Sequence, residues 1–174
     1  MKSLKDYVVT IPDFPEPGIK FRDITGIVSS GEGFKLCIDM LLERLAGVEF
    51  DAIVALESRG FIFGAPIAAA LGKAFIPVRK KGKLPRATIE RSYSLEYGQA
   101  TIEIHRDAIK PGERVIVVDD LIATGGTAKA ACELVESLGG KVVELLFVME
   151  LPDLKGREAL KGYKVESLIS FEGE

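Results

Sequence analysis

Apolar residues along this chain follow two patterns that alternate with each other. Ala52–Leu56, Val115–Val118 and Val142–Met149 are short and almost continuously apolar, which is typical of strands covered on both faces. Phe34–Leu45 and Thr124–Leu138 repeat apolar residues every three or four positions, as expected of helices with one buried face. The alternation predicts an α/β fold with a mostly parallel sheet flanked by helices.

Weaker patterns complete the predicted sheet. Phe61–Leu71 is apolar and ends at a glycine, which predicts a buried helix. Ala74–Val78 predicts a strand, and Pro77 places it near an edge or at a strand end. Thr101–His105 alternates polar and apolar residues, which predicts a strand with one wet face that carries His105. The last predicted elements are a short helix and a strand, at Asp153–Leu160 and Tyr163–Phe171.

Composition narrows the classes of protein. The 174 residues suit one domain, and 47% hydrophobic with 28% charged residues excludes a disordered chain. A net charge of −3 disfavours nucleic acid and acidic membranes as partners. Every uncharged apolar run is shorter than the roughly 20 residues that cross a bilayer, and Met1–Asp6 lacks the apolar stretch of a secretory signal. We therefore expect a cytoplasmic, single-domain protein over residues 1–174, without nucleic-acid or membrane partners.

The two cysteines offer no chemistry of their own. Cys37 and Cys132 lie far apart in the sequence and form no CxxC pair, which disfavours a disulfide scaffold or a zinc site. Each falls on the apolar face of a predicted helix. We expect both thiols in the core.

Residues 79–98 depart from both patterns because they are polar, basic and poorly periodic. We interpret this segment as a long flexible loop that leaves the core. A solvated loop is the simplest interpretation, and a lid over an anion site is the alternative. Nucleic-acid contact is disfavoured by the acidic net charge and by the lack of a basic patch interleaved with aromatics.

The segment after Val118 carries two kinds of chemistry. Thr124–Thr127 places two glycines and two hydroxyls at a predicted helix start, where free backbone N–H groups can hold a phosphate. Asp119 and Asp120 would repel a bare phosphate, so they fit hydroxyls or a divalent cation on the same ligand. A plain turn followed by a capping carboxylate is the alternative. The two halves together favour a sugar phosphate as the ligand.

A resemblance gives this segment a more specific interpretation. Val115–Thr127 resembles the phosphoribosyl-diphosphate signature of the type I phosphoribosyltransferases. It implies that fold, and it implies that Asp119 and Asp120 bind the ribose hydroxyls. The residues implied to surround the 5-phosphate are Ala123, Thr124, Gly125, Gly126 and Thr127.

A second anion site is predicted after the first buried strand. Glu57–Phe61 opens a helix and presents Arg59, which can donate to a pair of oxygens. An ordinary helix start with a surface arginine is the alternative. The resemblance implies that this stretch is the diphosphate loop, with a cis peptide expected at Ser58–Arg59 and a catalytic role for Arg59. The residues implied to bind diphosphate are Ser58, Arg59, Gly60, Arg79, Lys80 and Lys83.

Two further stretches resemble the adenine-specific branch of the family. Phe14–Ile24 resembles its N-terminal hood, although a proline-rich start is also common in plain packing. The hood is implied to span residues 1–28, and the residues implied to contact the base are Lys20, Phe21, Arg22 and Leu121. Ser92–Gly98 matches the same branch, and it implies that Glu96 handles the base proton; a solvated glutamate is the alternative.

The implied reaction joins adenine to 5-phosphoribosyl 1-diphosphate and yields AMP and diphosphate, a purine-salvage step. Mg²⁺ is implied as the cofactor, held mainly by substrate oxygens with water-mediated contacts to Asp119 and Asp120 rather than by direct protein ligands. A homodimer is also implied. Enzymes for 6-oxopurines carry an aspartate near the base where this chain has Ala123, which disfavours hypoxanthine and guanine. Another base such as xanthine or a pyrimidine, and a non-catalytic sensor of the sugar diphosphate, stay open as alternatives.

Overall fold

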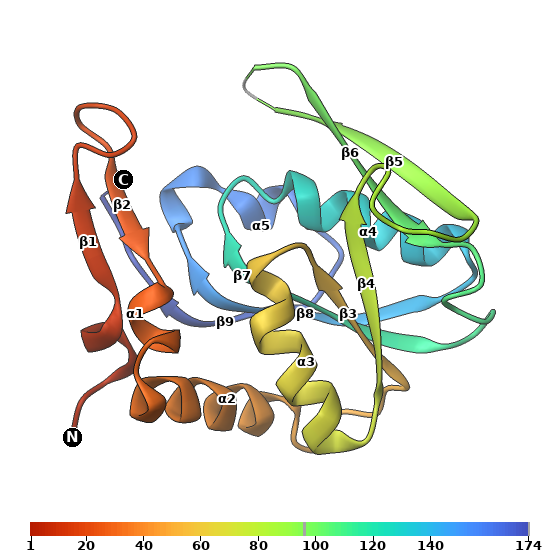
Figure 1. Ribbon diagram of the computed structural model, residues 1–174, viewed down its shortest axis with the longest axis horizontal. Helices are drawn as coiled ribbons and strands as arrows, with labels where there is room; N and C mark the ends of the chain where they lie inside the picture. The colour runs from red at the N-terminus through yellow and green to blue at the C-terminus, as the bar shows by residue number, and fades with distance from the viewer. Residues whose placement is uncertain (96, 174) are drawn as a thin grey trace.

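A computed structural model describes residues 1–95 and 97–173. Its centre is a seven-stranded sheet in the order β5-β6-β4-β3-β7-β8-β9 (Figure 1). The strands are β3 (Ala52–Leu56), β4 (Ala74–Lys80), β5 (Thr88–Ser94), β6 (Gln99–His105), β7 (Arg114–Ile122), β8 (Lys141–Glu150) and β9 (Val165–Ser170). The five neighbouring strands β4, β3, β7, β8 and β9 pair in parallel, and β6 pairs antiparallel with both β4 and β5. The predicted α/β fold with a mostly parallel sheet is confirmed.

Helices cover both faces of this sheet (Figure 1). Neighbouring residues of the central strands enter different cores: Ile53 and Ile116 pack with α2 (Gly31–Leu45) and α3 (Arg59–Leu71), and Val54 packs with α4 (Gly126–Ser137). Both faces of these central strands are buried, which explains why their sequences are continuously apolar. Among the described residues, no helix has the length and apolar content to span a bilayer.

Both cysteines lie in these cores, as predicted. Cys37 belongs to the α2–α3 core and Cys132 to the α4 core, and each is fully buried as a free thiol. Burial raises the pKa of each thiol to about 12. Both side chains therefore behave as small apolar core residues.

The N-terminal residues form a small unit at the β9 end of the sheet (Figure 1), and its buried residues belong to the α2–α3 core. It consists of η1 (Leu4–Tyr7), the antiparallel pair β1 (Val9–Pro12) and β2 (Lys20–Asp23), and α1 (Thr25–Val28). The Arg22 guanidinium lies 4.7 Å from the ring centroid of Phe171, which follows β9. This contact joins β2 of the N-terminal unit to the residue that follows the last strand.

The segment 79–98 is more regular than we predicted. Its first two residues end β4, and Thr88–Ser94 forms β5, which pairs along its whole length with β6. Ile89 and Tyr93 pack against the α4 core, and the residues between them are Glu90, Arg91 and Ser92. The two charged residues in the middle of the strand hid this pattern in the sequence.

Two further predictions about the strands need correction. β4 lies inside the sheet rather than at its edge; Pro77 is accommodated because β4 pairs with β6 only at Arg79 and Lys80, beyond the proline. His105 was predicted to be exposed, yet it pairs with Thr88 of β5 and is only 9% exposed. The His105 error arose because strand β5 was absent from the prediction, whereas the edge position of β4 was inferred from its proline.

Candidate functional site

Three cavities meet where β3 and β7 end, and Leu121 contributes to all of them. The cradle cavity, about 90 Å³, is lined by Asp119, Leu121–Ala128 and Phe147. The central cavity, about 440 Å³, is lined by Glu57, Ser58, Arg59, Lys80, Tyr93, Asp119–Leu121 and Thr127. The hood cavity, about 370 Å³, is lined by Ile19–Arg22, Ile24, Arg59, Asp120, Leu121, Thr124, Met149, Leu151 and Leu154. Ligands of parallel sheets bind at this edge, beyond the carboxyl ends of the strands.

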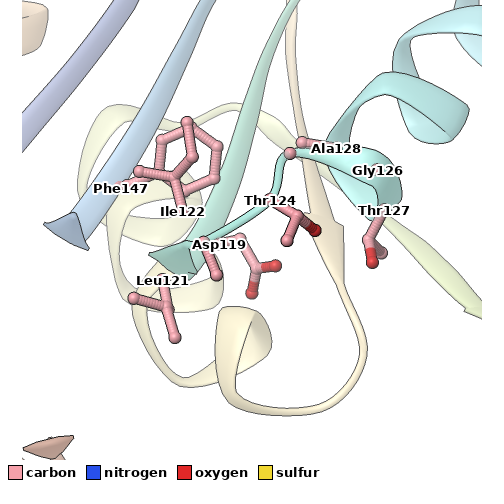
Figure 2. A pocket seen from close by; sticks show the side chains of 10 residues that line it. Asp119, Leu121, Ile122, Thr124, Gly126, Thr127, Ala128 and Phe147 are labelled. Carbon is pink, nitrogen blue, oxygen red and sulfur yellow. The ribbon is translucent and has the colours of Figure 1, made fainter. Parts of the chain in front are cut away.

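The cradle cavity is built by the turn from β7 into α4. Its lining includes all five predicted phosphate residues, and Figure 2 shows the side chains of Asp119, Thr124 and Thr127 beside this turn. The first N–H groups of α4 have no partner inside the helix, so they are available to an anion. Gly125 has φ +82°, and a Cβ at this position would lie 2.6 Å from the carbonyl oxygen of Gly156. Only glycine fits this turn.

The acidic pair lies on the last part of β7, because the strand runs on to Ile122 instead of ending at Val118 as predicted. Asp119 lines the cradle and central cavities, and Asp120 lines the central and hood cavities. Asp119 Oδ1 accepts the backbone N–H of Asp120 at 2.8 Å. Burial first, and then the charge of Asp120, raise the pKa of Asp119 well above its ordinary value. Two adjacent acids therefore separate the three cavities.

Arg59, at the start of α3, faces this acidic pair. Its Nε lies 2.7 Å from Asp120 Oδ2, and the residue lines both the central and the hood cavity. Gly60 lets the start of α3 lie close to the end of β7, since a Cβ on Gly60 would be 2.9 Å from Asp119 Oδ1. The cis peptide predicted at Ser58–Arg59 lies one bond earlier, at Glu57–Ser58. The structure thus places Arg59 where it can contact several parts of one ligand.

The predicted basic residues take different positions. Lys80 lines the central cavity, whereas Arg79 and Lys83 are absent from its described lining. Arg79 Nη2 lies 2.8 Å from Glu57 Oε1, and the Lys80 backbone N–H donates to Glu57 Oε2 at 2.7 Å. Although burial opposes it, these two contacts keep the pKa of Glu57 below its ordinary value. In this structure Arg79 therefore supports the 57–60 loop instead of facing the cavity.

A buried carboxylate below the basic segment also shapes it. Glu103 of β6 is 4% exposed and accepts the backbone N–H of Leu84 at 2.8 Å. Burial alone would raise the pKa of Glu103. Hydrogen bonds from the N–H groups of Leu84, Gly82 and Lys83 and from the Thr88 hydroxyl outweigh burial, so the net pKa is lowered and the group stays ionised. The turn that follows Lys80 is thus held by its own backbone amides.

The hood cavity brings together the four residues predicted to contact a base. Lys20, Phe21 and Arg22 come from β2, and Leu121 comes from β7. The ring of Phe14 packs edge-on against Phe21 with centroids 5.2 Å apart. The lining is mainly apolar and includes four charged residues, Lys20, Arg22, Arg59 and Asp120, which suits a flat aromatic ligand.

Sequence reasoning missed part of this lining. Ile24, Met149, Leu151 and Leu154 complete the hood cavity, and Tyr93 of β5 lines the central one. The position of Met149 at the carboxyl end of a parallel strand was the available signal. Ala123 was expected near the base; it lines the cradle cavity and is absent from the described lining of the hood cavity. The predicted Glu96 lies outside the described residues.

Comparisons with known proteins agree with this geometry. The family model described as a phosphoribosyl transferase domain matches residues 27–172. An adenine phosphoribosyltransferase of Butyrivibrio fibrisolvens is 62% identical to this chain, and the alignment covers all of this chain and 96% of that protein. A crystal structure of the enzyme from Thermoanaerobacter pseudethanolicus superposes with a TM-score of 0.93 at 52% identity, over 97% of this chain and 98% of that one. The enzyme from Saccharomyces cerevisiae, complexed with adenine and an imino-altritol bisphosphate, superposes with a TM-score of 0.88 at 47% identity, over 94% of this chain and 95% of that one.

Proposed function

We infer that this chain, which belongs to the adenine phosphoribosyltransferases within the phosphoribosyl transferase family, joins adenine to 5-phosphoribosyl 1-diphosphate. The products are AMP and diphosphate, so the enzyme is a pentosyltransferase of purine salvage. One observation carries this function: an apolar hood cavity and a phosphate cradle flank the consecutive acids Asp119 and Asp120. A nucleoside monophosphate needs these three environments in this order.

Each part of the substrates has a proposed place. The 5-phosphate occupies the cradle cavity on Ala123–Thr127, and the ribose hydroxyls face Asp119 and Asp120. The diphosphate occupies the central cavity beside Ser58, Arg59 and Lys80. Gly60, Arg79 and Lys83, also predicted to bind it, lie outside the described lining of this cavity. Adenine occupies the hood cavity between Phe21 and Leu121, near Lys20 and Arg22. The support is that the described residues named here, apart from Gly60, Arg79 and Lys83, line these cavities.

Catalysis is proposed to be mainly electrostatic. Breaking the bond from C1 to diphosphate leaves positive charge on the sugar and negative charge on the leaving group, so fixed charges nearby stabilise the transition state. Arg59 and Lys80 lie beside the central cavity for this purpose. Glu96 is proposed to manage the base proton. The predicted homodimer and cytoplasmic location stay predictions.

The residues also fit the proposed Mg²⁺. Asp119 and Asp120 offer carboxylate oxygens to the central cavity, and Mg²⁺ prefers such oxygens together with water and substrate phosphates. A bound ion would neutralise charge on the diphosphate. The proposal keeps water between the ion and this pair, because Mg²⁺ dehydrates reluctantly and is commonly held by substrate phosphates and water.

The test measures diphosphate release with Mg²⁺, phosphoribosyl diphosphate and five bases in parallel: adenine, hypoxanthine, guanine, xanthine and uracil. Release with adenine alone supports the proposal. Release with another base keeps the phosphate sites and overturns the interpretation of Lys20, Phe21 and Arg22. Binding of the sugar diphosphate without release favours a sensor.

Substitution of two residues tests the mechanism. Arg59→Ala is expected to lower kcat/KM by about 10²–10³-fold, as expected when a preorganised charge is removed. Glu96→Gln is expected to lower kcat by about 10²–10⁴-fold, the usual contribution of a general acid or base. Full turnover by either variant removes that residue from the mechanism.

A further inference from the structure

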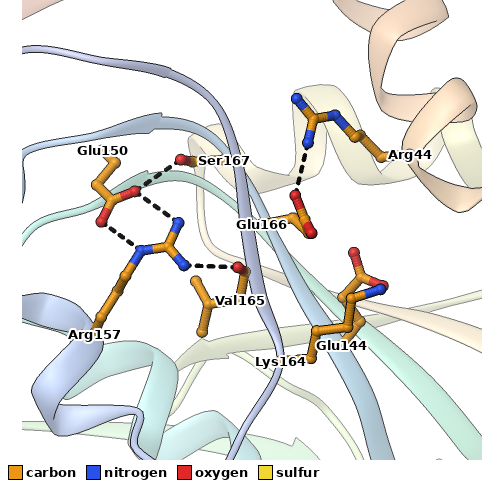
Figure 3. A network of polar contacts seen from close by, with 8 residues as sticks. All are labelled: Arg44, Glu144, Glu150, Arg157, Lys164, Val165, Glu166 and Ser167. Atoms are coloured by element: carbon orange, nitrogen blue, oxygen red, sulfur yellow. Dashed lines mark hydrogen bonds and ion pairs between the residues drawn. The ribbon is translucent and has the colours of Figure 1, made fainter.

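An ion pair connects elements that carry the two ends of the proposed ligand site. Glu150, the last residue of β8, lies between Met149 and Leu151, which both line the hood cavity. Its carboxylate is mostly buried and accepts Arg157 Nε at 2.7 Å and Nη2 at 2.9 Å (Figure 3). Ser167 donates to the same carboxylate at 2.8 Å. Such a two-point grip fixes orientation as well as distance.

Arg157 connects Glu150 to the cradle turn through the helix that carries it. It lies in the short helix α5 (Gly156–Ala159), and its Nη1 also donates to the Val165 carbonyl at 2.8 Å. The preceding residue, Gly156, packs against the cradle turn so closely that a Cβ there would be 2.4 Å from the Ala123 carbonyl oxygen. A Cβ on Gly125 would in turn meet the Gly156 carbonyl oxygen at 2.6 Å. A shift of α5 would therefore move the cradle turn or collide with it.

The residues between the two partners form a closed loop. Leu151 and Leu154 line the hood cavity, and Gly156 supports the cradle. We propose that the Glu150–Arg157 pair holds the hood wall and the phosphate cradle at the spacing that AMP requires. Both are positioning residues, because neither is among the described residues that line the three cavities. This inference rests on the proposed function and deepens it.

The ionised state of Glu150 agrees with this role. Hydrogen bonds from Arg157 lower its pKa against the opposing effect of burial, and Ser167 lowers it further. The pair therefore stays charged at neutral pH. Of the pairs drawn in Figure 3, Arg44–Glu166, at 2.7 Å, has the same chemistry but joins α2 to β9 away from the cavities. It is the matched control.

The experiment compares the affinities of AMP and ribose 5-phosphate by calorimetry, since AMP must reach both walls and ribose 5-phosphate needs only the cradle. Arg157→Met and Glu150→Gln are each expected to weaken AMP about tenfold, a common result of a small misplacement, and to weaken ribose 5-phosphate less than about twofold. Arg157→Lys keeps one charged contact and should fall between. Arg44→Met should change neither affinity. Thermal melts restrict the comparison to folded variants.

Each outcome decides one question. Equal losses for both ligands, or an unchanged AMP affinity in the folded variants, overturn the spacing role. A merely structural role would reduce the amount of active protein and leave both dissociation constants alone. If the wild-type protein binds ribose 5-phosphate but not AMP, the proposed function fails in its base site, and the spacing role fails with it.

Discussion

The cradle and hood cavities lie next to each other but are built in different ways. Apart from Phe147, the cradle lining comes from one stretch of the chain, Asp119 and Leu121–Ala128. The groups there that suit an anion are largely backbone N–H groups and hydroxyls. The hood cavity draws side chains from β2, the start of α3, β7 and the residues around the end of β8. Leu121 and Thr124 line both cavities.

The difference follows from the proposed ligands. A phosphate is small and charged, so a single turn at a helix start supplies enough donors to hold it. A flat base offers mostly apolar surface and must be enclosed from several sides. Damage to the cradle should therefore act through backbone geometry, whereas damage to the hood should act through the loss of individual side chains.

The strongest test of this contrast is Gly125→Ala. A left-handed conformation costs a non-glycine residue about 1–2 kcal/mol, and the new Cβ would also lie 2.6 Å from the Gly156 carbonyl oxygen. The turn must open, so we expect KM for phosphoribosyl diphosphate to rise by about 100-fold or more, the scale of a 1 Å misplacement. Steady-state kinetics at saturating adenine would measure it.

Gly72→Ala separates strain from collision. Gly72 ends α3 with φ +62°, and a Cβ at this position would have no described neighbour within 4 Å. The variant should lose about 1 kcal/mol of stability and keep its KM. A similar KM for Gly125→Ala and the wild type would show that the cradle does not need this turn.

Phe21→Ala tests the opposite kind of construction. The ring is half-buried, lines the hood cavity and meets Phe14 edge-on. Its removal should raise KM for adenine about 10- to 30-fold, consistent with the 1–3 kcal/mol lost when a stacked base loses an aromatic partner. KM for phosphoribosyl diphosphate should change less than about twofold. Equal effects on both substrates would contradict the separation of the two cavities.

The same contrast explains how far the sequence could be interpreted. The cradle residues were predicted together because Thr124–Thr127 and the acids before them are adjacent in the chain. Leu154 was missed because its role depends on the placement of the segment that follows β8, which no local pattern specifies. For Met149 the one signal was its position at the end of a predicted parallel strand. The β5–β6 hairpin was missed because the charged residues Glu90 and Arg91 interrupt the apolar pattern of β5.

The smallest expected effect concerns stability, and Asp119→Asn tests it. Burial and the charge of Asp120 raise the pKa of Asp119 above its ordinary value of 3.8. The folded protein then binds more protons than the unfolded chain between the two pKa values, so the free energy of unfolding falls as pH rises through that window. At pH 7 the fold is therefore less stable than it would be with an unshifted pKa at Asp119, and each unit of pKa shift corresponds to about 1.4 kcal/mol.

Asp119→Asn should therefore raise the free energy of unfolding at pH 7 by about 1 kcal/mol or more, and the gain should shrink toward pH 3.8 and below. Urea melts at several pH values would measure it. Asp51 gives the control with the opposite sign: hydrogen bonds from Arg114 lower its pKa, so Asp51→Asn should lose stability above the unfolded pKa. The stabilised Asp119→Asn variant should turn over more slowly, because a neutral amide accepts hydrogen bonds from ribose hydroxyls less strongly than a carboxylate does. A variant that is no more stable at pH 7 would show that the acid at the cradle is accommodated without strain on the fold.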